Sequence, residues 1–246
     1  MRPLVVLAMA CNLNWDQLEG TALVVGQGGI GKAIGVVLER EAPKLKLLRA
    51  GRGGPLPLNI CSEQSLTELK TELQQHGPLR LVINTAGWLH SGGIGPEKRL
   101  QVVSRSGLEE SFAVNAFGAI LLAKAVDEAF GHGQQAWFAS LSARVGSIGD
   151  NQLGGWYSYR AAKAAQNQLL RTLAIEWQRR RPAVAVTLLH PGTTATGLSE
   201  PFRTAVAPEK LFSAERAAEQ LVSLIAKQTP LESGRFLAWD GQNIPW

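Results

Sequence analysis

The sequence predicts an α/β fold in which a parallel sheet is covered by helices on both faces. Short, almost wholly apolar runs alternate along the chain with longer segments of helical period. Strands that are buried on both faces have such continuous apolar runs. No internal repeat, linker or low-complexity segment interrupts the alternation. We therefore expect a single doubly wound domain over residues 19–246, preceded by an extension of unknown role at 1–18.

The expected elements follow one another in a regular order. Strands are expected at 21–26, 45–51, 79–87, 134–142, 183–192 and 234–241, and helices at 31–41, 62–77, 106–130, 157–180 and 213–227. The helix over 62–77 begins after a serine and ends at a glycine, which are common capping residues. This order is typical of a Rossmann fold, in which ligands bind at the carboxyl ends of the strands.

Composition and charge exclude several classes of protein. The formal net charge is +5, and much of it lies in the run "QRRRP" at 178–182. We interpret this run as a solvated helix end whose cations complement the helix dipole. Basic residues are not interleaved with aromatic ones, so no nucleic-acid partner is expected.

The cysteines and histidines form no cluster that would bind a metal. Cys11 and Cys61 belong to no CxxC motif, and the four histidines are scattered. No disulfide framework or metal site is expected, and the cysteine usage fits a reducing cytoplasm. The apolar run at the N-terminus is only about eight residues long, and no run approaches the length of a membrane span. We expect a cytoplasmic protein that does not insert into a membrane.

The first expected strand runs directly into "GQGGIGKAIG" at 26–35. Its glycines have the G-x-G-x-x-G spacing: the first makes a tight turn, the second lets a pyrophosphate approach the backbone, and the third packs the helix against the strand. The N-terminus of the following helix would face the phosphates with free N–H groups. The alternative is a packing turn without a ligand. The predicted dinucleotide-binding residues are Gly26, Gly28, Gly29, Ile30 and Gly31.

The end of the second expected strand indicates which dinucleotide binds. The stretch "LLRAGRGG" contains Arg49 and Arg52 and has no acid nearby. An acid about 20 residues after the glycine motif accepts from the ribose 2′-OH of NAD, whereas an arginine accommodates the 2′-phosphate of NADP. NADP(H) is therefore predicted in preference to NAD(H). The alternative is that these arginines are solvated surface charges.

The segment "GSIGDNQLGGWYSYRAAKAAQ" at 146–166 contains two tyrosines and one lysine. Residues four apart share a helix face, so Tyr159 has Lys163 one turn above its ring, whereas Tyr157 has Ala161 there. A phenol has an ordinary pKa of about 10, which a neighbouring cation lowers. Tyr159 is therefore predicted to act as a general acid–base. A Tyr/Lys pair on its own is usually a surface pair, but this one follows a glycine-rich loop in a nucleotide-binding fold.

Five motifs in this order resemble those of the short-chain dehydrogenases/reductases, over residues 20–246. The glycine turn resembles the family's TGxxxGxG motif, and "NTAG" (84–87) its NNAG motif. "YRAAK" (159–163) matches YxxxK, "PGTTAT" (191–196) matches the PG motif, and Asn115 in "AVNAFGA" matches the helix asparagine. The sequence of residues 142–165 and the ending "WDGQNIPW" are similar to the C-factor and sniffer-like branch of small carbonyl reductases.

The resemblance implies a role for each matching residue. Tyr159 would donate a proton to a carbonyl oxygen, and Lys163 would hold the nicotinamide ribose and lower the pKa of the tyrosine. Asn115 would anchor a water that relays protons, and Ser142 would hydrogen-bond the substrate oxygen. Further cofactor contacts are implied for Asn59, Ile60, Asn84, Thr85, Ala86, Gly87, Pro191, Gly192, Thr194 and Thr196.

The sequence departs from the family pattern in three places. The glycine turn is one residue shorter than usual when 29–31 is matched to GxG, and Asn59 stands where an aspartate usually contacts adenine. Relatives also have two adjacent serines, the second of which is catalytic and lies three residues before a glycine. Counting back from Gly146 gives Ala143, and Ser142 lies on the opposite face of a strand. Either Ser142 turns inward, which we predict, or Ser147 substitutes, or the hydroxyl is missing.

The function predicted from these residues is NADP-dependent reduction of an aldehyde or ketone, or oxidation of the matching alcohol. The misplaced serine and the C-factor resemblance favour one alternative, an NAD(P)-binding signalling or regulatory protein with little turnover. An epimerase or dehydratase is a second alternative, which the absence of an added substrate domain disfavours. The resemblance also implies a homodimer or homotetramer packed through the helix that carries YxxxK. The substrate itself is not predicted.

Overall fold

The computed structural model describes residues 15–246, apart from the side chains of residues 204 and 205. Within that range seven strands form one sheet in the order β3-β2-β1-β4-β5-β6-β9, and all neighbouring strands are parallel. The order reverses between β1 and β4, which makes the sheet doubly wound, as the sequence predicts. The strands are β1 Gly20–Val25, β2 Leu45–Gly51, β3 Leu56–Pro57, β4 Leu79–Asn84, β5 Ala136–Leu141, β6 Val184–His190 and β9 Arg235–Ala238.

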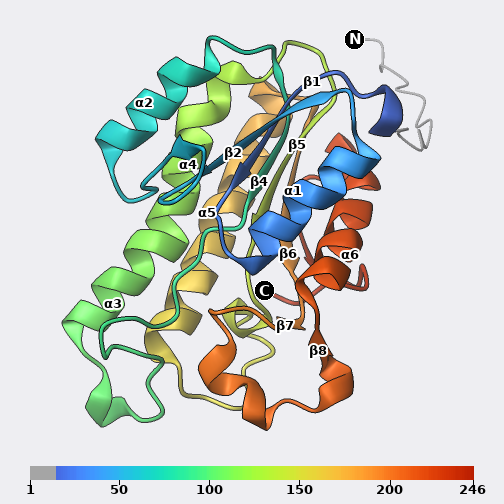
Figure 1. Cartoon of the computed structure of the whole chain (residues 1–246). Coiled ribbons are helices and arrows are strands. Elements are labelled where there is room, and N and C mark those ends of the chain that lie inside the picture. The colour runs from blue at the N-terminus through green and yellow to red at the C-terminus, as the bar shows by residue number, and fades with distance from the viewer. Residues whose placement is uncertain (1–14) are drawn as a thin grey trace, which may run out of the picture.

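Helices cover both faces of this sheet (Figure 1). α1 and α6 pack against each other on one face, while α2, α4 and α5 cover the other, with α3 beside the first turns of α5. Each face has its own buried apolar layer, with Ile34 and Leu221 in one and Leu122 and Leu170 in the other. The helices are α1 Gly29–Glu41, α2 Glu63–Leu73, α3 Arg105–Phe112, α4 Gly118–Val126, α5 Tyr157–Arg180 and α6 Ala214–Ala226.

The structure differs from the expected elements at three points. The helix expected over 106–130 is interrupted by a π-helical turn, Ala113–Phe117, between α3 and α4. The short strand β3 was not expected, nor was the separate two-stranded pair of β7 (Thr193–Thr194) and β8 (Leu211–Phe212). π-Helical turns insert one residue into a helix and often lie at functional sites. Asn115 lies in this one.

The end of the expected N-terminal extension belongs to the core. Trp15–Gln17 form a 3-10 turn, and Trp15 and Leu18 are buried in the apolar layer that α1 and α6 share. The ring of Trp15 stacks on that of Trp137 with centroids 5.7 Å apart. Residues 1–14 of the extension, and with them Cys11, lie outside the described residues.

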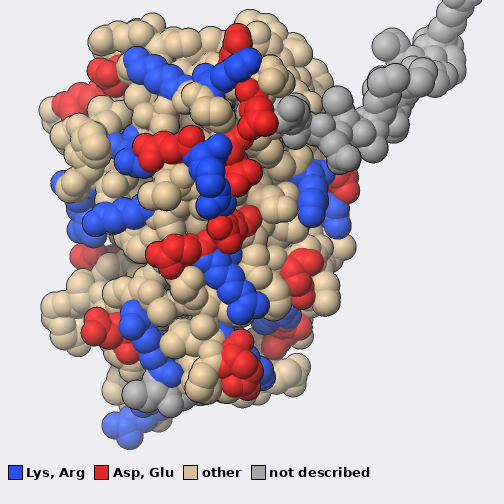
Figure 2. Space-filling view, turned by 45° about the vertical axis from the view of Figure 1, so that its right-hand side comes forward, with Lys and Arg blue, Asp and Glu red and all other residues tan. Residues whose placement is uncertain are grey.

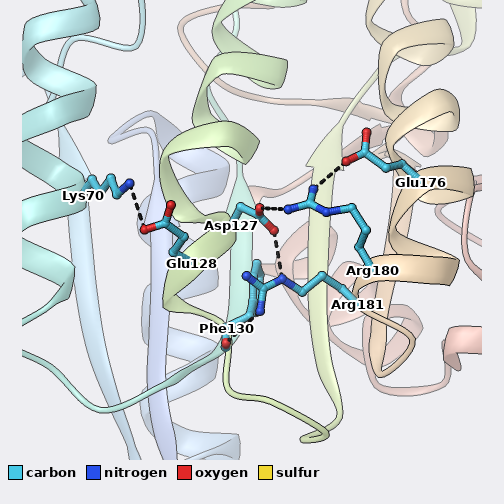
Figure 3. Close-up of polar contacts among 7 residues, drawn as sticks. All are labelled: Lys70, Asp127, Glu128, Phe130, Glu176, Arg180 and Arg181. Carbon is cyan, nitrogen blue, oxygen red and sulfur yellow. Dashed lines mark hydrogen bonds and ion pairs between the residues drawn. The ribbon is translucent and has the colours of Figure 1, made fainter.

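The basic run at the end of α5 is solvated only in part: Arg179 and Arg180 are exposed in the last turn, as the sequence predicts, whereas Arg181 is not. Asp127, at the end of α4, accepts hydrogen bonds from Arg180 Nη2 at 2.9 Å and from Arg181 Nε at 3.0 Å (Figure 3). The side chain of Arg181 is only 12% exposed. Glu176 pairs with Arg180, so the carboxylates of two helices hold these cations and join α4 to α5.

Charges of both signs are interspersed on the face shown in Figure 2. Exposed ion pairs such as Arg40–Glu219, which joins α1 to α6, contribute little each to stability. None of the helices in residues 15–246 is long and apolar enough to cross a membrane. The same residues contain no group of histidine, cysteine and acidic side chains that would hold a metal ion.

Candidate active site

A cavity of about 860 Å³ opens at the carboxyl ends of the central strands. Its walls come from the turn after β1, the segments after β2 and β4, the end of β5, the first turns of α5, and the segment after β6. This is the edge at which the strand order reverses, where open α/β sheets bind ligands. The cavity therefore lies where the sequence predicts a dinucleotide.

The glycine turn lines this cavity and has the shape of a phosphate cradle. Gly26 has φ +103°, and a Cβ on Gly31 would lie 2.1 Å from Gly26 O, so the chain turns sharply there and only glycine fits. At Gly28 nothing lies within 4 Å of an added Cβ, so the backbone is open to a ligand. Gly28 is also the N-cap of α1 and supplies no side-chain cap. The first-turn N–H groups are therefore available to an anion, and the cradle fits the pyrophosphate of a dinucleotide.

The structure separates the two arginines that were predicted to contact the cofactor. Arg52 lines the cavity, together with Asn59 and Ile60. Arg49 does not: its Nη2 pairs with Glu39 Oε1 at 2.8 Å, and its guanidinium covers Gly35 on α1. Arg49 lies within β2, where the pleat directs it onto the helix layer, whereas Arg52 lies just beyond the strand.

The "NTAG" segment shapes the cavity floor. Thr85, Ala86 and Gly87 line the cavity. Asn84 lies buried beneath them, where its Oδ1 accepts from Ala86 N at 3.1 Å and its Nδ2 donates to Ser140 Oγ at 3.0 Å. Asn84 therefore supports the turn, while its neighbours form the surface that a ligand would meet.

Asn115 holds the segment that follows "NTAG" from behind the cavity. Its Oδ1 accepts from Trp88 N at 3.1 Å, and its Nδ2 donates to Trp88 O at 2.8 Å. The same Nδ2 lies 3.3 Å from Ser111 Oγ. These are the contacts of its side-chain amide in the structure, and Asn115 is not part of the cavity wall. The predicted role, anchoring a water, stays a prediction.

Tyr159 and Lys163 lie on one face of α5, as the sequence predicts. Tyr159 and Lys163 both line the cavity, and Lys163 Nζ lies 5.8 Å from the centroid of the Tyr159 ring. The ammonium donates to Leu141 O and to Gln166 Oε1, each at 2.9 Å. Tyr157, by contrast, is 41% exposed. Of the two tyrosines, only Tyr159 contacts a ligand-sized space.

Burial shifts the pKa of both groups toward their neutral forms. It raises the pKa of the Tyr159 phenol well above its usual range and lowers the pKa of the Lys163 ammonium to about 7. The sequence predicts that Lys163 lowers the pKa of the tyrosine, and this prediction is wrong for the protein alone. The cost of placing a phenolate in a dry environment exceeds the attraction of the nearby ammonium. Tyr159 is therefore a protonated phenol at neutral pH, which suits it to donate a proton.

The predicted serine is committed to another partner. Ser142 lines the cavity, but its Oγ donates to Asn167 Oδ1 at 2.6 Å, so its hydrogen points to α5. Ser147 is buried, and its Oγ accepts from Asp150 N at 3.1 Å, away from the cavity wall. Ala143 faces the cavity at the position where relatives have their serine. Ser142 therefore lies at the cavity, as predicted, while its hydroxyl hydrogen is directed at Asn167. The choice between Ser142 and a missing hydroxyl as the group that a substrate meets stays a prediction.

Of the predicted cofactor-binding residues after β6, two line the cavity and two do not. Pro191 and Thr196 line the cavity, whereas Gly192 packs against Phe212, and Thr194 pairs with Phe212 between β7 and β8. His190 also lines the cavity, and its Nδ1 is buried without a partner. Burial, and then the charge of Arg144, lower its pKa to about 4, so His190 is neutral at pH 7.

Sequence reasoning missed the part of the cavity wall that directly follows "NTAG". Trp88, His90, Ser91 and Leu198 line the cavity, and His90 Nε2 lies 3.1 Å from Leu198 O. This contact joins the loop after β4 to the segment after β6. Sequence position alone gives no signal for it, because the two residues are 108 positions apart.

The comparisons with known proteins show the family. The short chain dehydrogenase family profile matches residues 20–207, and the chain belongs to this family of oxidoreductases, whose members bind a nicotinamide cofactor. The chain is 31% identical to the C-signal of Myxococcus xanthus, over 69% of this chain and 94% of that protein. It is 30% identical to the 1-hydroxy-2-glutathionyl-2-methyl-3-butene dehydrogenase of Rhodococcus sp. (strain AD45), over 77% and 78% of the two chains.

Solved structures show the same fold. The NADPH-bound carbonyl reductase from chicken fatty liver superposes with a TM-score of 0.79 at 21% identity, covering 93% of this chain and all of that one. The carbonyl reductase Sniffer of D. melanogaster superposes with a TM-score of 0.78 at 20% identity and equal coverage. The resemblance drawn from the motifs is thereby confirmed.

Proposed function

We propose that this protein is an NADPH-dependent reductase that converts an aldehyde or ketone to the alcohol. One observation carries the proposal: the buried phenol of Tyr159 and the amino group of Lys163 share a cavity with an open phosphate cradle. A phosphate cradle alone indicates nucleotide binding. The buried Tyr159 adds a proton donor where the reactive end of a dinucleotide would lie.

The residues present fit NADPH, which when bound would supply a hydride to the carbonyl carbon. The glycine turn would hold the pyrophosphate through its free N–H groups, and Arg52 would face the 2′-phosphate. Lys163 would hold the ribose hydroxyls. The NADPH in the chicken carbonyl reductase supports the same choice of cofactor.

Tyr159 completes the reaction by donating its phenolic proton to the carbonyl oxygen. One hydride at carbon and one proton at oxygen convert the carbonyl to the alcohol, and the phenolate left behind takes a proton from solvent. Because burial disfavours that phenolate, the reprotonation is favourable at neutral pH. At neutral pH the phenol is therefore in the protonated form that reduction needs, whereas alcohol oxidation needs the phenolate.

The test is NADPH consumption by the purified protein across a panel of aldehydes and ketones, with NADH as the parallel cofactor. We expect turnover of at least one carbonyl, and faster turnover with NADPH than with NADH. Tight NADPH binding without turnover of any carbonyl would favour the signalling alternative. The C-signal relative and the committed Ser142 are the observations behind that alternative.

Restoring a hydroxyl at Ala143 is expected to speed the reaction. Ala143 faces the cavity, so an Ala143→Ser variant would place a donor beside the substrate oxygen. One added neutral hydrogen bond contributes about 1 kcal/mol, which corresponds to a gain in kcat of about fivefold. The measurement is kcat for the best carbonyl of the panel, with Ala161→Ser on the exposed face of α5 as the control.

The opposite result has a definite meaning. If Ala143→Ser gains nothing and Ser142→Ala loses activity while its cofactor affinity is kept, Ser142 leaves Asn167 and serves the substrate itself. That outcome would contradict the missing-hydroxyl interpretation.

A further inference from the structure

Glu97 lies in the loop between β4 and α3, yet its carboxylate reaches the start of α5. Its Oε2 accepts from Ser158 N at 3.1 Å, and its Oε1 accepts from Ser158 Oγ. Its main-chain oxygen accepts from Trp156 N. Glu97 is 6% exposed, an unusual burial for a carboxylate, which is retained only when its oxygens are well hydrogen-bonded. One residue thus binds the backbone on both sides of Tyr157.

The beginning of α5 needs this help because it has no local cap. Ser62, Ser104 and Ser213 cap α2, α3 and α6 with their own side chains. The N-cap of α5 is Trp156, which makes no side-chain cap bond and has φ +53°. This left-handed conformation is strained for a bulky residue and persists only where the surroundings hold it. The carboxylate of Glu97 supplies both the missing acceptor and a negative charge at the positive end of the helix dipole.

The contacts of Glu97 with Trp156 and Ser158, here called the clamp, lie directly beside Tyr159. Ser158 precedes Tyr159, and the Trp156 ring packs edge-on against the Tyr159 ring with centroids 6.1 Å apart. Ser158 O also accepts from Ser111 Oγ at 3.2 Å, and Ser111 Oγ lies 3.3 Å from Asn115 Nδ2. Hydrogen bonds therefore run from Glu97 through the first turn of α5 to the π-helical turn. A small displacement of a reacting group slows catalysis strongly.

We propose that Glu97 is a positioning residue that fixes the first turn of α5, and with it the phenol of Tyr159. It does not line the large cavity, so it acts through Ser158 and Trp156 rather than on a substrate. Its effect on kcat rests on the proposed function, whereas its effect on the order of the first turn of α5 does not. The two effects are therefore measured separately, by kinetics and by amide hydrogen exchange.

The first variant is Glu97→Gln, which keeps the size of the side chain but replaces one acceptor by a donor facing Ser158. The matched control is Glu109→Gln, because Glu109 is exposed on α3 and pairs with Arg105. In the protein without substrate, amide hydrogen exchange over residues 156–160 is expected to accelerate at least tenfold. In the active enzyme, kcat is expected to fall about tenfold or more, with KM and the Kd of NADPH within twofold of wild type.

The second variant tests whether Glu97 acts through Ser158. Ser158→Ala removes one of the donors, and the double variant Glu97→Gln/Ser158→Ala is expected to lose less than the product of the single losses. Independent, multiplicative losses would overturn the proposal. So would a fall in kcat with unchanged exchange over 156–160, or a lower Tm with exchange accelerated evenly over the whole chain.

The exchange measurement needs no turnover and separates this proposal from the proposed function. Faster exchange at 156–160 in a protein that reduces no carbonyl would support the clamp and sink the reductase proposal. A fully active Glu97→Gln variant with wild-type exchange would sink the clamp and leave the reductase proposal standing.

Discussion

Replacing Tyr159 with phenylalanine is expected to lower kcat for carbonyl reduction by about 10²- to 10⁴-fold, the range that a general acid contributes. The substitution removes only the hydroxyl and keeps the ring that packs against Trp156. A water molecule in the cavity would be a weaker and unpositioned proton donor in its place. The measurement is kcat under saturating carbonyl and NADPH, with the Kd of NADPH from a binding titration expected to stay within a few-fold of wild type.

Tyr157→Phe is the matched control, because Tyr157 begins the same helix but is 41% exposed. Its kcat is expected to stay within twofold of wild type. A Tyr159→Phe variant that retains its activity, or a Tyr157→Phe variant that loses it, would assign the proton donor to another group.

Burial raises the pKa of Tyr159, so the phenol stays protonated to high pH. Reduction therefore keeps its donor as the pH rises, whereas alcohol oxidation needs the phenolate and accelerates with pH.

The layered fold could be predicted because its signals are local. Strands that are buried on both faces appear in the sequence as continuous apolar runs, and in the helices between them the apolar residues recur with the helical period. The break between α3 and α4 could not be read in this way, because a π-helical turn adds one residue without changing the apolar character of the run. The inclusion of Trp15 in the core likewise depends on Trp137, far along the chain.

The site shows the same division between local and distant causes. The glycine spacing and the Tyr159–Lys163 pair are set within one turn or one helix, and both were predicted. Ser142 is directed by Asn167, 25 residues further on, and Tyr159 is held through a carboxylate 61 residues from Ser158. Spacing along the chain does not encode such contacts. The pKa of Tyr159 was predicted in the wrong direction for a related reason, since the depth of burial outweighs one nearby charge.

The second prediction concerns Lys163, whose replacement by methionine is expected to lower kcat strongly and to stabilise the protein. The ammonium is 2% exposed and makes hydrogen bonds but no ion pair in the described part of the chain, so its burial is costly. Methionine fills a similar volume without a charge, and Leu141 O keeps a donor in Gln166 Nε2 at 3.2 Å. We expect a gain of about 2 kcal/mol in the free energy of unfolding, or about 4 to 8 °C in Tm. The same variant is expected to lose about 10²-fold or more in kcat, because the group that orients the ribose and the phenol is gone.

The pH dependence of this gain identifies its cause. The pKa of Lys163 is about 7 in the folded protein against an ordinary 10.5. Between these values the unfolded chain holds a proton that the folded protein has released, so wild-type stability rises with pH across that window. The Tm advantage of Lys163→Met is therefore largest below pH 7 and narrows toward pH 10. Lys124→Met, on the exposed face of α4, is the control and should show no such trend. A Lys163→Met variant that is less stable than wild type at pH 6 would mean that the hydrogen bonds of the ammonium outweigh the cost of burying it.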